Sequence, residues 1–339
     1  MRSKLQVDYA AGNNLLARRS MECLLRCRAA RRLLGKWARG QPVVHLQTSV
    51  SSAVFSTCGV IVKLYANNPS GRAQQAGEAR ALDAMQGAPG FAQRLAAFSR
   101  RGVSFVILEH VGLDGFEMCK AGLVGNSAWL RAAFDVCQAL AAMHERGWQH
   151  TDVKPDNMAF DLHRWRLIDL GLSRPLAAQH PCVCGTVPYV LPELALADAA
   201  GCRSAARAGR GRENDRFALA LSLVQMAERT VICGSARGRS RRISVNALLR
   251  LRTKPVHHIA QEHVVVLHAL VDIVLHALDT TRAELHWDAD LMRCWYTDEL
   301  ADGDLVRDFA QLHALPFGRD GSDVLWGHLL TILSYRERP

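Results

Sequence analysis

Apolar residues follow two different repeats along the chain, and the first repeat is typical of β-strands. Short runs rich in β-branched and aromatic residues predict five strands, over residues 42–47, 52–57, 60–63, 91–98 and 104–108. Gly59 supplies the turn between the second and third runs. A helical repeat over 77–86 places Ala79, Leu82 and Met85 on one face, whereas residues 69–75 read as a loop. The first part of the chain is therefore expected to form a small sheet with one helix.

Beyond residue 112 the apolar positions recur every three or four residues, as in amphipathic helices. Ser127 is expected to cap the first strong helix and Gly147 to end it. Further elements are predicted as two short strands and one strongly apolar helix, over residues 158–161, 165–168 and 264–278. The tail carries Trp287, Trp295 and Trp326 and is expected to pack as core. This second part is therefore predicted to be mainly helical.

The composition fits a folded protein with a full core and a basic surface. The chain has 339 residues, of which 49% are hydrophobic, and its formal net charge is +10. That charge favours acidic partners, such as phosphorylated peptides, acidic substrates, nucleic acid or an anionic membrane face. The alternative is that it reflects solvated arginines. Two arginine-rich stretches, 203–212 and 237–242, read as flexible insertions, and few aromatic residues interleave them, which argues against nucleic acid.

The ten cysteines do not form the pattern of a disulfide framework. Cys23 with Cys27, and Cys182 with Cys184, lack the paired spacing of a zinc site. No apolar run approaches the ~18 residues of a membrane span. The nucleus or the cytoplasm is therefore the expected location.

Residues 1–40 are basic and poor in acidic residues. Their leucines recur at loosely helical spacing with arginines between them. Three functional interpretations stay open, namely nuclear import, contact with an anionic surface and a transit peptide. The fourth is an extension helix or a partly ordered tail that packs on the sheet-forming part.

Three motifs occur in a fixed order and carry the chemistry. Residues 150–157 read HTDVKPDN, residues 169–171 read DLG, and residues 185–193 read GTVPYVLPE. They resemble the H-R-D-L-K-P-E-N, D-F-G and G-T-x-x-Y-x-A-P-E motifs of the protein kinases. The resemblance covers about residues 43–290. It implies an α+β, bilobal protein-kinase fold, with a basic extension (1–40), an N-lobe and hinge (41–112) and a C-lobe (113–339).

The resemblance implies a role for each polar residue of these motifs. Asp152 would accept the proton of the substrate hydroxyl, and Lys154 would reach the moving phosphoryl group. Asn157 and Asp169 would hold Mg²⁺, which prefers oxygen ligands. Thr186 would bond Asp152 and Lys154, and the pair of Lys154 and Thr186 marks the Ser/Thr kinases.

The nucleotide is expected to lie against the N-lobe. The strand ending in Lys63 resembles the V-A-I-K strand, so Lys63 would hold the phosphates and pair with Glu78. The remaining nucleotide contacts are expected from the lid, the adenine pocket and the hinge, at Val50, Ala53, Ile61, Leu108, Glu109, Val111 and Ala159. The lid, residues 48–53, lacks the glycines that allow close backbone approach, so it should cover the nucleotide less tightly.

Three further residues are expected to support the site. In the family the equivalent of His150 buttresses the metal-binding loop, and Asp215 would anchor the backbone of the catalytic loop. Glu193 would be an interior carboxylate paired with Arg282, because an unpaired buried charge is costly. Thr151 stands where many kinases have an arginine that binds a phosphate on the activation loop, so that form of control is expected to be weak.

The sequence therefore predicts a serine/threonine protein kinase that uses ATP and Mg²⁺, acts on protein substrates with acidic ones favoured by the net charge, and is a monomer. The glycine-free lid and the arginine and alanine bias resemble divergent viral kinases of the herpesvirus conserved type. One alternative is a pseudokinase scaffold, but such proteins usually lose Lys63, Asp152 or Asp169, and all three are present. The other is a small-molecule phosphotransferase, which would not need the motif at 185–193.

Overall fold

The structure is a computed structural model, and it describes residues 7–9, 32, 35–39, 41–48, 52–66, 68–100, 103–178, 185–186, 189–199, 210–228, 241–243, 248–251, 256, 259–281, 284–288, 293–297 and 321–336. The chain forms two compact units. Unit 1 comprises Met1–Gly112 and Ile168–Ser173, and unit 2 comprises Leu113–Leu167 and Arg174–Pro339.

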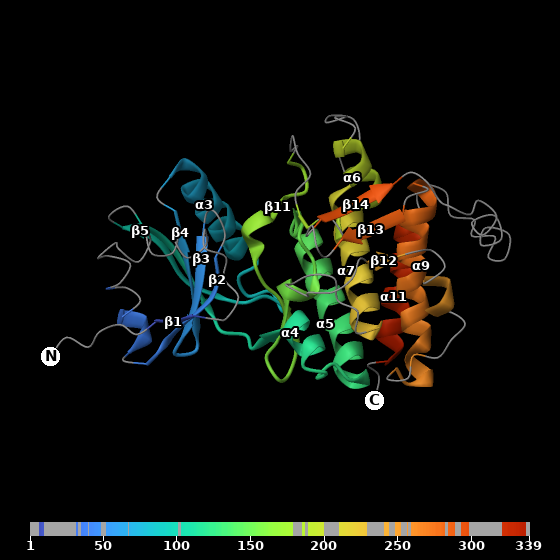
Figure 1. Ribbon diagram of the computed structural model, residues 1–339, viewed down its shortest axis with the longest axis horizontal. Helices are drawn as coiled ribbons and strands as arrows, with labels where there is room; N and C mark the ends of the chain where they lie inside the picture. The colour runs from blue at the N-terminus through green and yellow to red at the C-terminus, as the bar shows by residue number, and fades with distance from the viewer. Residues whose placement is uncertain are drawn as a thin grey trace. The chain divides into compact units, whose positions relative to one another are not determined.

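Unit 1 is built on a six-stranded sheet (Figure 1). Its strands are β1 (Val7–Tyr9), β2 (Val43–Thr48), β3 (Ser52–Thr57), β4 (Val60–Tyr65), β5 (Arg94–Arg100) and β6 (Val103–Glu109). They are ordered β1-β2-β3-β4-β6-β5, and each neighbouring pair is antiparallel except β1 with β2. The apolar face is packed with Val43, Phe55, Val62, Leu64 and Ile107, each with no exposed surface. The five predicted strands are therefore confirmed.

The helix of unit 1 is longer than the sequence pattern indicated. Helix α3 spans Pro69–Ala84, so the prediction of a loop over 69–75 is wrong. The side chain of Asn68 caps the helix by accepting a hydrogen bond from the backbone N–H of Gly71, at 2.7 Å. Pro69 fits the first helical position, where no N–H is required. The residues Asn68 and Pro69 thus mark the start of the helix in the sequence. The prediction missed them because it followed the apolar repeat, which begins later.

Unit 2 is mainly helical. Its helices are α4 (Gly115–Lys120), α5 (Asn126–Glu145), α6 (Pro192–Ala199), α7 (Gly211–Glu228), α9 (Val264–Thr281) and α11 (Gly321–Arg336). Two short 3-10 helices, η1 (Pro155–Asn157) and η4 (Gln261–His263), belong to the same unit. A strand-rich unit 1 and a helical unit 2 confirm the predicted bilobal α+β fold.

Helix α5 packs beside α7 in the core of unit 2. Trp129 of α5 is fully buried, and its indole N–H donates to the carbonyl of Leu223 in α7 at 2.8 Å. The predicted cap at Ser127 is wrong, because Gly125 is the N-cap and Asn126 opens the helix. The side chain of Asn126 instead accepts from the backbone N–H of Ala260 at 2.9 Å.

Several short strands in unit 2 support loops. Strand β9 (Met158–Phe160) pairs with β10 (Trp165–Leu167) and β7 (Leu113–Asp114). Strand β8 (Trp148–Gln149) pairs with β11 (Arg174–Pro175). These ladders flank residues 150–157 on both sides, and they confirm the two strands predicted near 158–168.

A third sheet among the described residues of unit 2 was not predicted. Its strands are β12 (Arg241–Ile243), β13 (Glu284–Asp288) and β14 (Arg293–Thr297), in that order. Arg241 and Arg242 therefore lie in a strand, and the prediction of a flexible insertion is wrong for them. Trp326 of α11 is 4% exposed, which confirms its place in the core.

Some predictions fall outside the described residues. These are the lid position Val50, the proposed partner Arg282, the two cysteine pairs, the side chains of Trp287 and Trp295, and most of residues 1–40 and 203–209. Among the described residues, no helix combines the length and apolar character that a membrane crossing requires. Among the described residues, Cys58, Cys119 and Cys137 are not in disulfide bonds.

Substitution of two glycines in α3 tests whether the first turn of the helix is held close to the backbone of Ala66. A Cβ on Gly71 would lie 2.2 Å from the carbonyl oxygen of Ala66, whereas one on Gly77 meets no atom within 4 Å. We expect Gly71→Ala to destabilise the protein by ~2 kcal/mol or more because backbone must move. Gly77→Ala should stabilise it by up to ~1 kcal/mol through helix propensity. Urea unfolding of both variants measures this, and equal effects would contradict the close approach at Gly71.

Candidate active site

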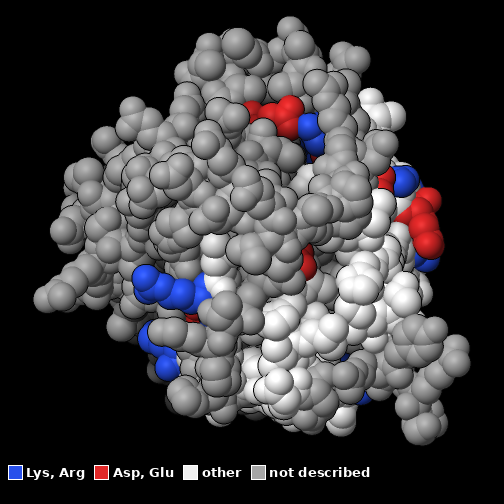
Figure 2. Space-filling model, turned by 90° about the vertical axis from the view of Figure 1, so that its right-hand side faces the viewer, with Lys and Arg blue, Asp and Glu red and all other residues white. Residues whose placement is uncertain are grey.

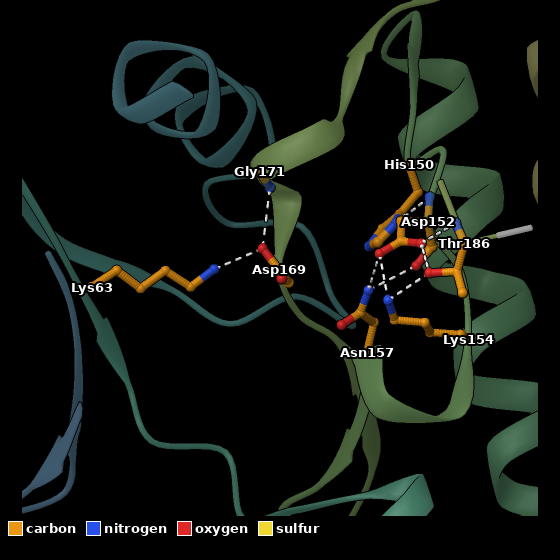
Figure 3. A network of polar contacts seen from close by, with 8 residues as sticks. All are labelled: Lys63, His150, Asp152, Lys154, Asn157, Asp169, Gly171 and Thr186. Atoms are coloured by element: carbon orange, nitrogen blue, oxygen red, sulfur yellow. Dashed lines mark hydrogen bonds and ion pairs between the residues drawn. The ribbon is translucent and has the colours of Figure 1, made fainter. Parts of the chain in front are cut away.

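The polar cluster of unit 1 is centred on Lys63, which β4 carries into a buried position (Figure 3). Its ammonium lies 2.7 Å from Glu78 Oε1 and 2.8 Å from Asp169 Oδ1. Glu78 comes from α3 and is 1% exposed. The predicted ion pair between Lys63 and Glu78 is therefore confirmed, and Asp169 completes it as a second carboxylate.

The two carboxylates keep Lys63 charged. Burial alone would lower the pKa of Lys63, because it disfavours the charged form. The negative charges of Asp169 and Glu78, and their hydrogen bonds to the ammonium, outweigh burial and raise the pKa above its ordinary value. A permanent cation at this position suits the binding of phosphate groups.

Asp169 is held by an unusual backbone conformation. Its φ of 59° lies in the left-handed region, which Asp tolerates better than most residues. Its side chain caps η2 (Leu170–Leu172) by accepting from the N–H of Gly171, at 3.4 Å. The carboxylate is still 45% exposed. It can therefore be reached by a cation from solvent.

The predicted hinge residues lie at the end of β6 and just after it. Leu108 is 4% exposed and Val111 is 6% exposed. The N–H of Glu109 donates to the carbonyl of Gln93 at 3.1 Å. Neither backbone group of Val111 has a hydrogen-bond partner among the described residues, so both can bind a ligand.

The predicted adenine-pocket residues are placed in strands. Ala53 in β3 is fully buried, and Ile61 in β4 is paired with Leu108. Ala159 belongs to unit 2, where it is buried in β9 opposite Asp114. Their contact with a nucleotide stays a prediction.

The polar cluster of unit 2 is centred on the carboxylate of Asp152 (Figure 3). Its Oδ1 accepts from the backbone N–H of Thr186 at 2.9 Å and from the Thr186 hydroxyl at 2.8 Å. Its Oδ2 accepts from Lys154 Nζ at 2.8 Å and from Asn157 Nδ2 at 3.0 Å. Lys154 Nζ also donates to the Thr186 hydroxyl at 2.8 Å. The structure thus brings three of the predicted residues together around the carboxylate of a fourth, Asp152.

Asn157 has the orientation of an oxygen ligand. Its Nδ2 donates twice to Asp152, to the backbone carbonyl at 2.8 Å and to the carboxylate. Its Oδ1 has no hydrogen-bond partner among the described residues. Because Mg²⁺ takes amide and carboxylate oxygens, Asn157 Oδ1 and the exposed Asp169 carboxylate both have donor atoms that fit this ion.

Asp215 of α7 fixes the backbone beneath this cluster. It is completely buried, and it accepts from the N–H groups of His150 and Thr151, each at 2.8 Å. His144 Nε2 lies 2.9 Å from the same carboxylate. His150 is buried too, and its Nδ1 accepts from the N–H of Asp152 at 3.3 Å. The predicted anchoring role of Asp215 is confirmed.

Gly185 meets the catalytic loop at close range. Its φ is +113°, and a Cβ there would lie 2.4 Å from the carbonyl oxygen of Thr151. Thr151 itself has a φ of 70°, which is strained for a β-branched residue. Only glycine fits this approach without displacing the loop.

Glu193 pairs with an arginine that was not predicted as its partner. Arg210 forms ion pairs with both Glu193 and Glu213. The side chain of Glu193 is 40% exposed, so the prediction of an interior carboxylate is wrong. Arg282, the predicted partner, lies outside the described residues.

Two further carboxyl groups lie close to the catalytic loop and were not predicted as part of it. Asp114 caps α4, and burial, together with the nearby charge of Asp156, raises its pKa to about 6. Burial also raises the pKa of Asp156, whose Oδ2 has no partner among the described residues. The Asp-Gly-Phe-Glu sequence at 114–117 is a helix-start signal that could have located Asp114.

Comparison with known proteins gives one family. A family model described as "Protein kinase domain" matches residues 52–284. A dual serine/threonine and tyrosine protein kinase of Pimephales promelas is 33% identical over 90 residues, which are 26% of this chain and 10% of that protein. A probable serine/threonine-protein kinase, fnkB of Dictyostelium discoideum, is 36% identical over 77 residues, or 21% of this chain and 14% of that protein. The chain thus aligns with about a tenth of the length of these relatives.

The anchoring role of Asp215 predicts a large loss of stability on substitution. Asp215→Ala leaves two buried N–H groups and one imidazole nitrogen without their acceptor, so we expect a loss of ~3 kcal/mol or more. Ser222→Ala, on the same helix, removes only the bond from a buried hydroxyl to the carbonyl of Ala218 and should cost under ~1 kcal/mol. Urea unfolding of both variants measures the difference. Similar losses would show that Asp215 does not anchor the loop.

The raised pKa of Asp114 predicts a specific dependence of stability on pH. Its ordinary value is 3.8 and its folded value is about 6, so between these values the folded protein keeps a proton that the unfolded chain releases. Stability should therefore fall as pH rises from about 4 to 6. Asparagine keeps the helix cap but cannot titrate, so Asp114→Asn removes the pH-dependent part of the unfolding free energy that comes from this carboxyl group. We expect that part to be ~1 kcal/mol, because Asp114 is partly exposed and solvent screens its interactions.

The measurement is the difference in unfolding free energy between the protein and Asp114→Asn at several pH values. The same substitution at Asp161 is the matched control. Burial would raise the pKa of Asp161, but the backbone N–H groups of Arg164 and His163 and the guanidinium of Arg166 outweigh burial and lower it. Its stabilising contribution is lost as pH falls, which is the opposite sign. A pH-independent difference for Asp114→Asn would contradict the assignment.

Proposed function

The chain belongs to the protein kinase family, and we propose that it is a serine/threonine kinase that transfers the γ-phosphoryl group of ATP to protein hydroxyls. The observation that carries this proposal is the network around Asp152, in which Lys154, Asn157 and Thr186 all contact one carboxylate. Phosphoryl transfer needs an oriented base and fixed charges more than covalent chemistry from the protein. The network supplies both.

Asp152 is proposed to accept the proton of the substrate hydroxyl. Both of its oxygens already accept two hydrogen bonds, which fills about four acceptor positions of a carboxylate. An incoming hydroxyl must therefore replace one of these donors, and the side chains of Thr186 and Asn157 are the neutral ones. Lys154 would stay in place and stabilise negative charge on the group being transferred.

Lys63 and Glu78 are proposed to hold the phosphates. Asn157 and Asp169 are proposed to hold Mg²⁺, and the unpaired backbone groups of Val111 to bind the adenine edge. Magnesium-bound ATP supplies the phosphoryl group and neutralises its charge. A scaffold without catalysis would need none of these contacts, so their joint presence favours an enzyme over a pseudokinase.

Acceptor specificity is the finer part of the proposal. Lys154 and Thr186 support serine and threonine as acceptors, because their mutual contact is the arrangement that the Ser/Thr kinases share. The relatives include proteins named as dual serine/threonine and tyrosine kinases. The experiment must therefore distinguish transfer to serine and threonine from transfer to tyrosine.

The charge of the protein bears on the nature of its partners. The net charge favours acidic substrates, but Asp114 and Asp156 beside the catalytic loop would repel acidic groups there. On the face shown in Figure 2, the described lysines and arginines lie in separate small groups, several of them beside acidic residues. Nucleic acid is not proposed as a partner, because few aromatic residues interleave the arginine-rich stretches of the sequence. A monomeric state, location in the nucleus or cytoplasm and likeness to viral kinases stay predictions of the sequence.

The experiment that tests this function is phosphate transfer from γ-labelled ATP to a degenerate peptide library. The full chain is compared with Asp152→Asn, which keeps the size of the side chain and removes its charge. Glu145→Gln is the matched control, since Glu145 is an exposed carboxylate at the end of α5. We expect transfer by the protein and the control and none by Asp152→Asn; equal transfer by all three would refute the assignment.

Lys63→Met and Asp169→Asn should each lower kcat/KM by ~10³-fold or more, because each removes a charge positioned for the transition state. The fold should survive Asp169→Asn, since Asp169 is half exposed, whereas Lys63→Met leaves the buried Glu78 without its cation and should also lower stability. Steady-state rates with circular dichroism as the folding check measure this. Near-normal turnover in either variant would exclude that residue from the site.

The labelled peptides also identify the acceptor. We expect phosphoserine and phosphothreonine with negligible phosphotyrosine, because Thr186 and Lys154 form the Ser/Thr arrangement around Asp152. Thr186→Val should abolish most transfer, and Thr186→Ser, which keeps the hydroxyl, should retain it. Phosphoamino-acid analysis dominated by phosphotyrosine would overturn the specificity while leaving kinase activity intact.

A further inference from the structure

Tyr65 lies two residues after Lys63 on β4, and both side chains reach the same carboxylate. Side chains two apart on a strand point to the same face. The Tyr65 hydroxyl donates to Glu78 Oε2, and Lys63 Nζ donates to Glu78 Oε1 at 2.7 Å. Tyr65 is 1% exposed and Glu78 is also 1% exposed, so neither bond competes with solvent. Each oxygen of Glu78 therefore has its own donor, and both donors come from one strand.

We propose that Tyr65 is a positioning residue that fixes the Glu78 carboxylate for its ion pair with Lys63. The proposal rests on the function proposed above, in which Lys63 holds the phosphates of ATP. None of the motifs that identified the site includes Tyr65.

The reason lies in the freedom of the Glu78 side chain. The last torsion of a glutamate is broad, so a single donor leaves the carboxylate free to rotate. A second donor on the other oxygen fixes the plane of the group. Without it, the Lys63 ammonium would be drawn toward its other partner, Asp169, which is 2.8 Å away and more exposed. Tyr65 thus keeps the ammonium shared between two carboxylates.

The same strand also fixes where α3 begins. Ala66 follows Tyr65, and its carbonyl oxygen lies so close to Gly71 that no Cβ fits between them. Helix α3 is therefore held against the end of β4 at two points: at its first turn through Gly71, and near its middle through Glu78. A helix held at two points cannot slide along the strand without breaking one contact.

The hydroxyl remains a donor over the working pH range. Burial, and then the adjacent negative charge of Glu78, raise the pKa of Tyr65 well above its ordinary value. The bond from Tyr65 to Glu78 is thus permanent, and the position of Glu78 does not depend on the protonation of its partner.

The test is a double-mutant cycle of Tyr65→Phe and Glu78→Gln, with kcat/KM for peptide phosphorylation as the readout. Tyr65→Phe removes only the hydroxyl, and we expect it to lower kcat/KM by about tenfold, the scale of one hydrogen bond to a charged group. In the Glu78→Gln background the same change should cost less than about twofold, because the carboxylate through which Tyr65 acts is gone. A Tyr65→Leu cycle repeats the test with a side chain that packs without any polar atom.

Tyr189→Phe is the control for loss of a buried hydroxyl elsewhere, since Tyr189 donates to Gln225 at 2.7 Å in unit 2. Tyr189→Phe should change kcat/KM by the same factor in the unmodified protein and in the Glu78→Gln variant. If Tyr65→Phe costs equally in both backgrounds, or costs nothing alone, Tyr65 does not position Glu78 and the inference is overturned. If Glu78→Gln itself leaves kcat/KM unchanged, the proposed phosphate-holding pair is wrong, which is a separate failure.

Discussion

The buried carboxylate of Asp215 is the interaction on which the geometry of the catalytic loop depends. It has no exposed surface, and three donors from two other segments surround it. A charge in the interior is tolerated only when its hydrogen bonds are complete, so the backbone at His150 and Thr151 cannot move without a high cost. That constraint fixes the chain directly before Asp152. The half-buried side chains of Lys154 and Thr186 can then converge on Asp152.

The cluster in unit 1 follows the same principle with the signs reversed. There a buried cation, Lys63, is stabilised by two carboxylates, and one of them is held by an additional hydroxyl. Lys63 and Glu78 in unit 1, and Asp152 and Asp215 in unit 2, each have at least two partners. Fixed charges that need no reorganisation are what phosphoryl transfer requires from a protein, because the reaction itself involves little covalent participation.

Much of the fold could be predicted because it depends on local signals. The five predicted strands of unit 1 have β-branched runs and turn residues, and helix α5 has a strong apolar repeat, so only the ends of these elements were misplaced. Strand β1 was not predicted, because residues 1–40 show a loosely helical spacing. The start of α3 was missed because Asn68 and Pro69 are capping signals without apolar residues nearby. The sheet of β12, β13 and β14 was missed because β12 is short, lies in an arginine-rich stretch and is far in sequence from β13 and β14.

The motif residues could be placed together because the resemblance carries long-range information. Contacts that lie outside the motifs could not be predicted in this way. His144 is 71 residues from Asp215, and no local pattern marks that pair. Arg210 was hidden within an arginine-rich stretch that contains several equivalent candidates for Glu193. Tyr65 was assigned no role, because a tyrosine in a strand is most often simply packed.

The central claim is that the Asp152 network activates a protein hydroxyl and not water. The most direct measurement compares, in one reaction, the ADP released with the phosphate that becomes bound to peptide and the phosphate that stays free. The account predicts about one phosphopeptide for each ADP, with little free phosphate, because the base and Lys154 are positioned for an acceptor hydroxyl. ADP accompanied mainly by free phosphate, or no ADP at all from the folded protein, would contradict it.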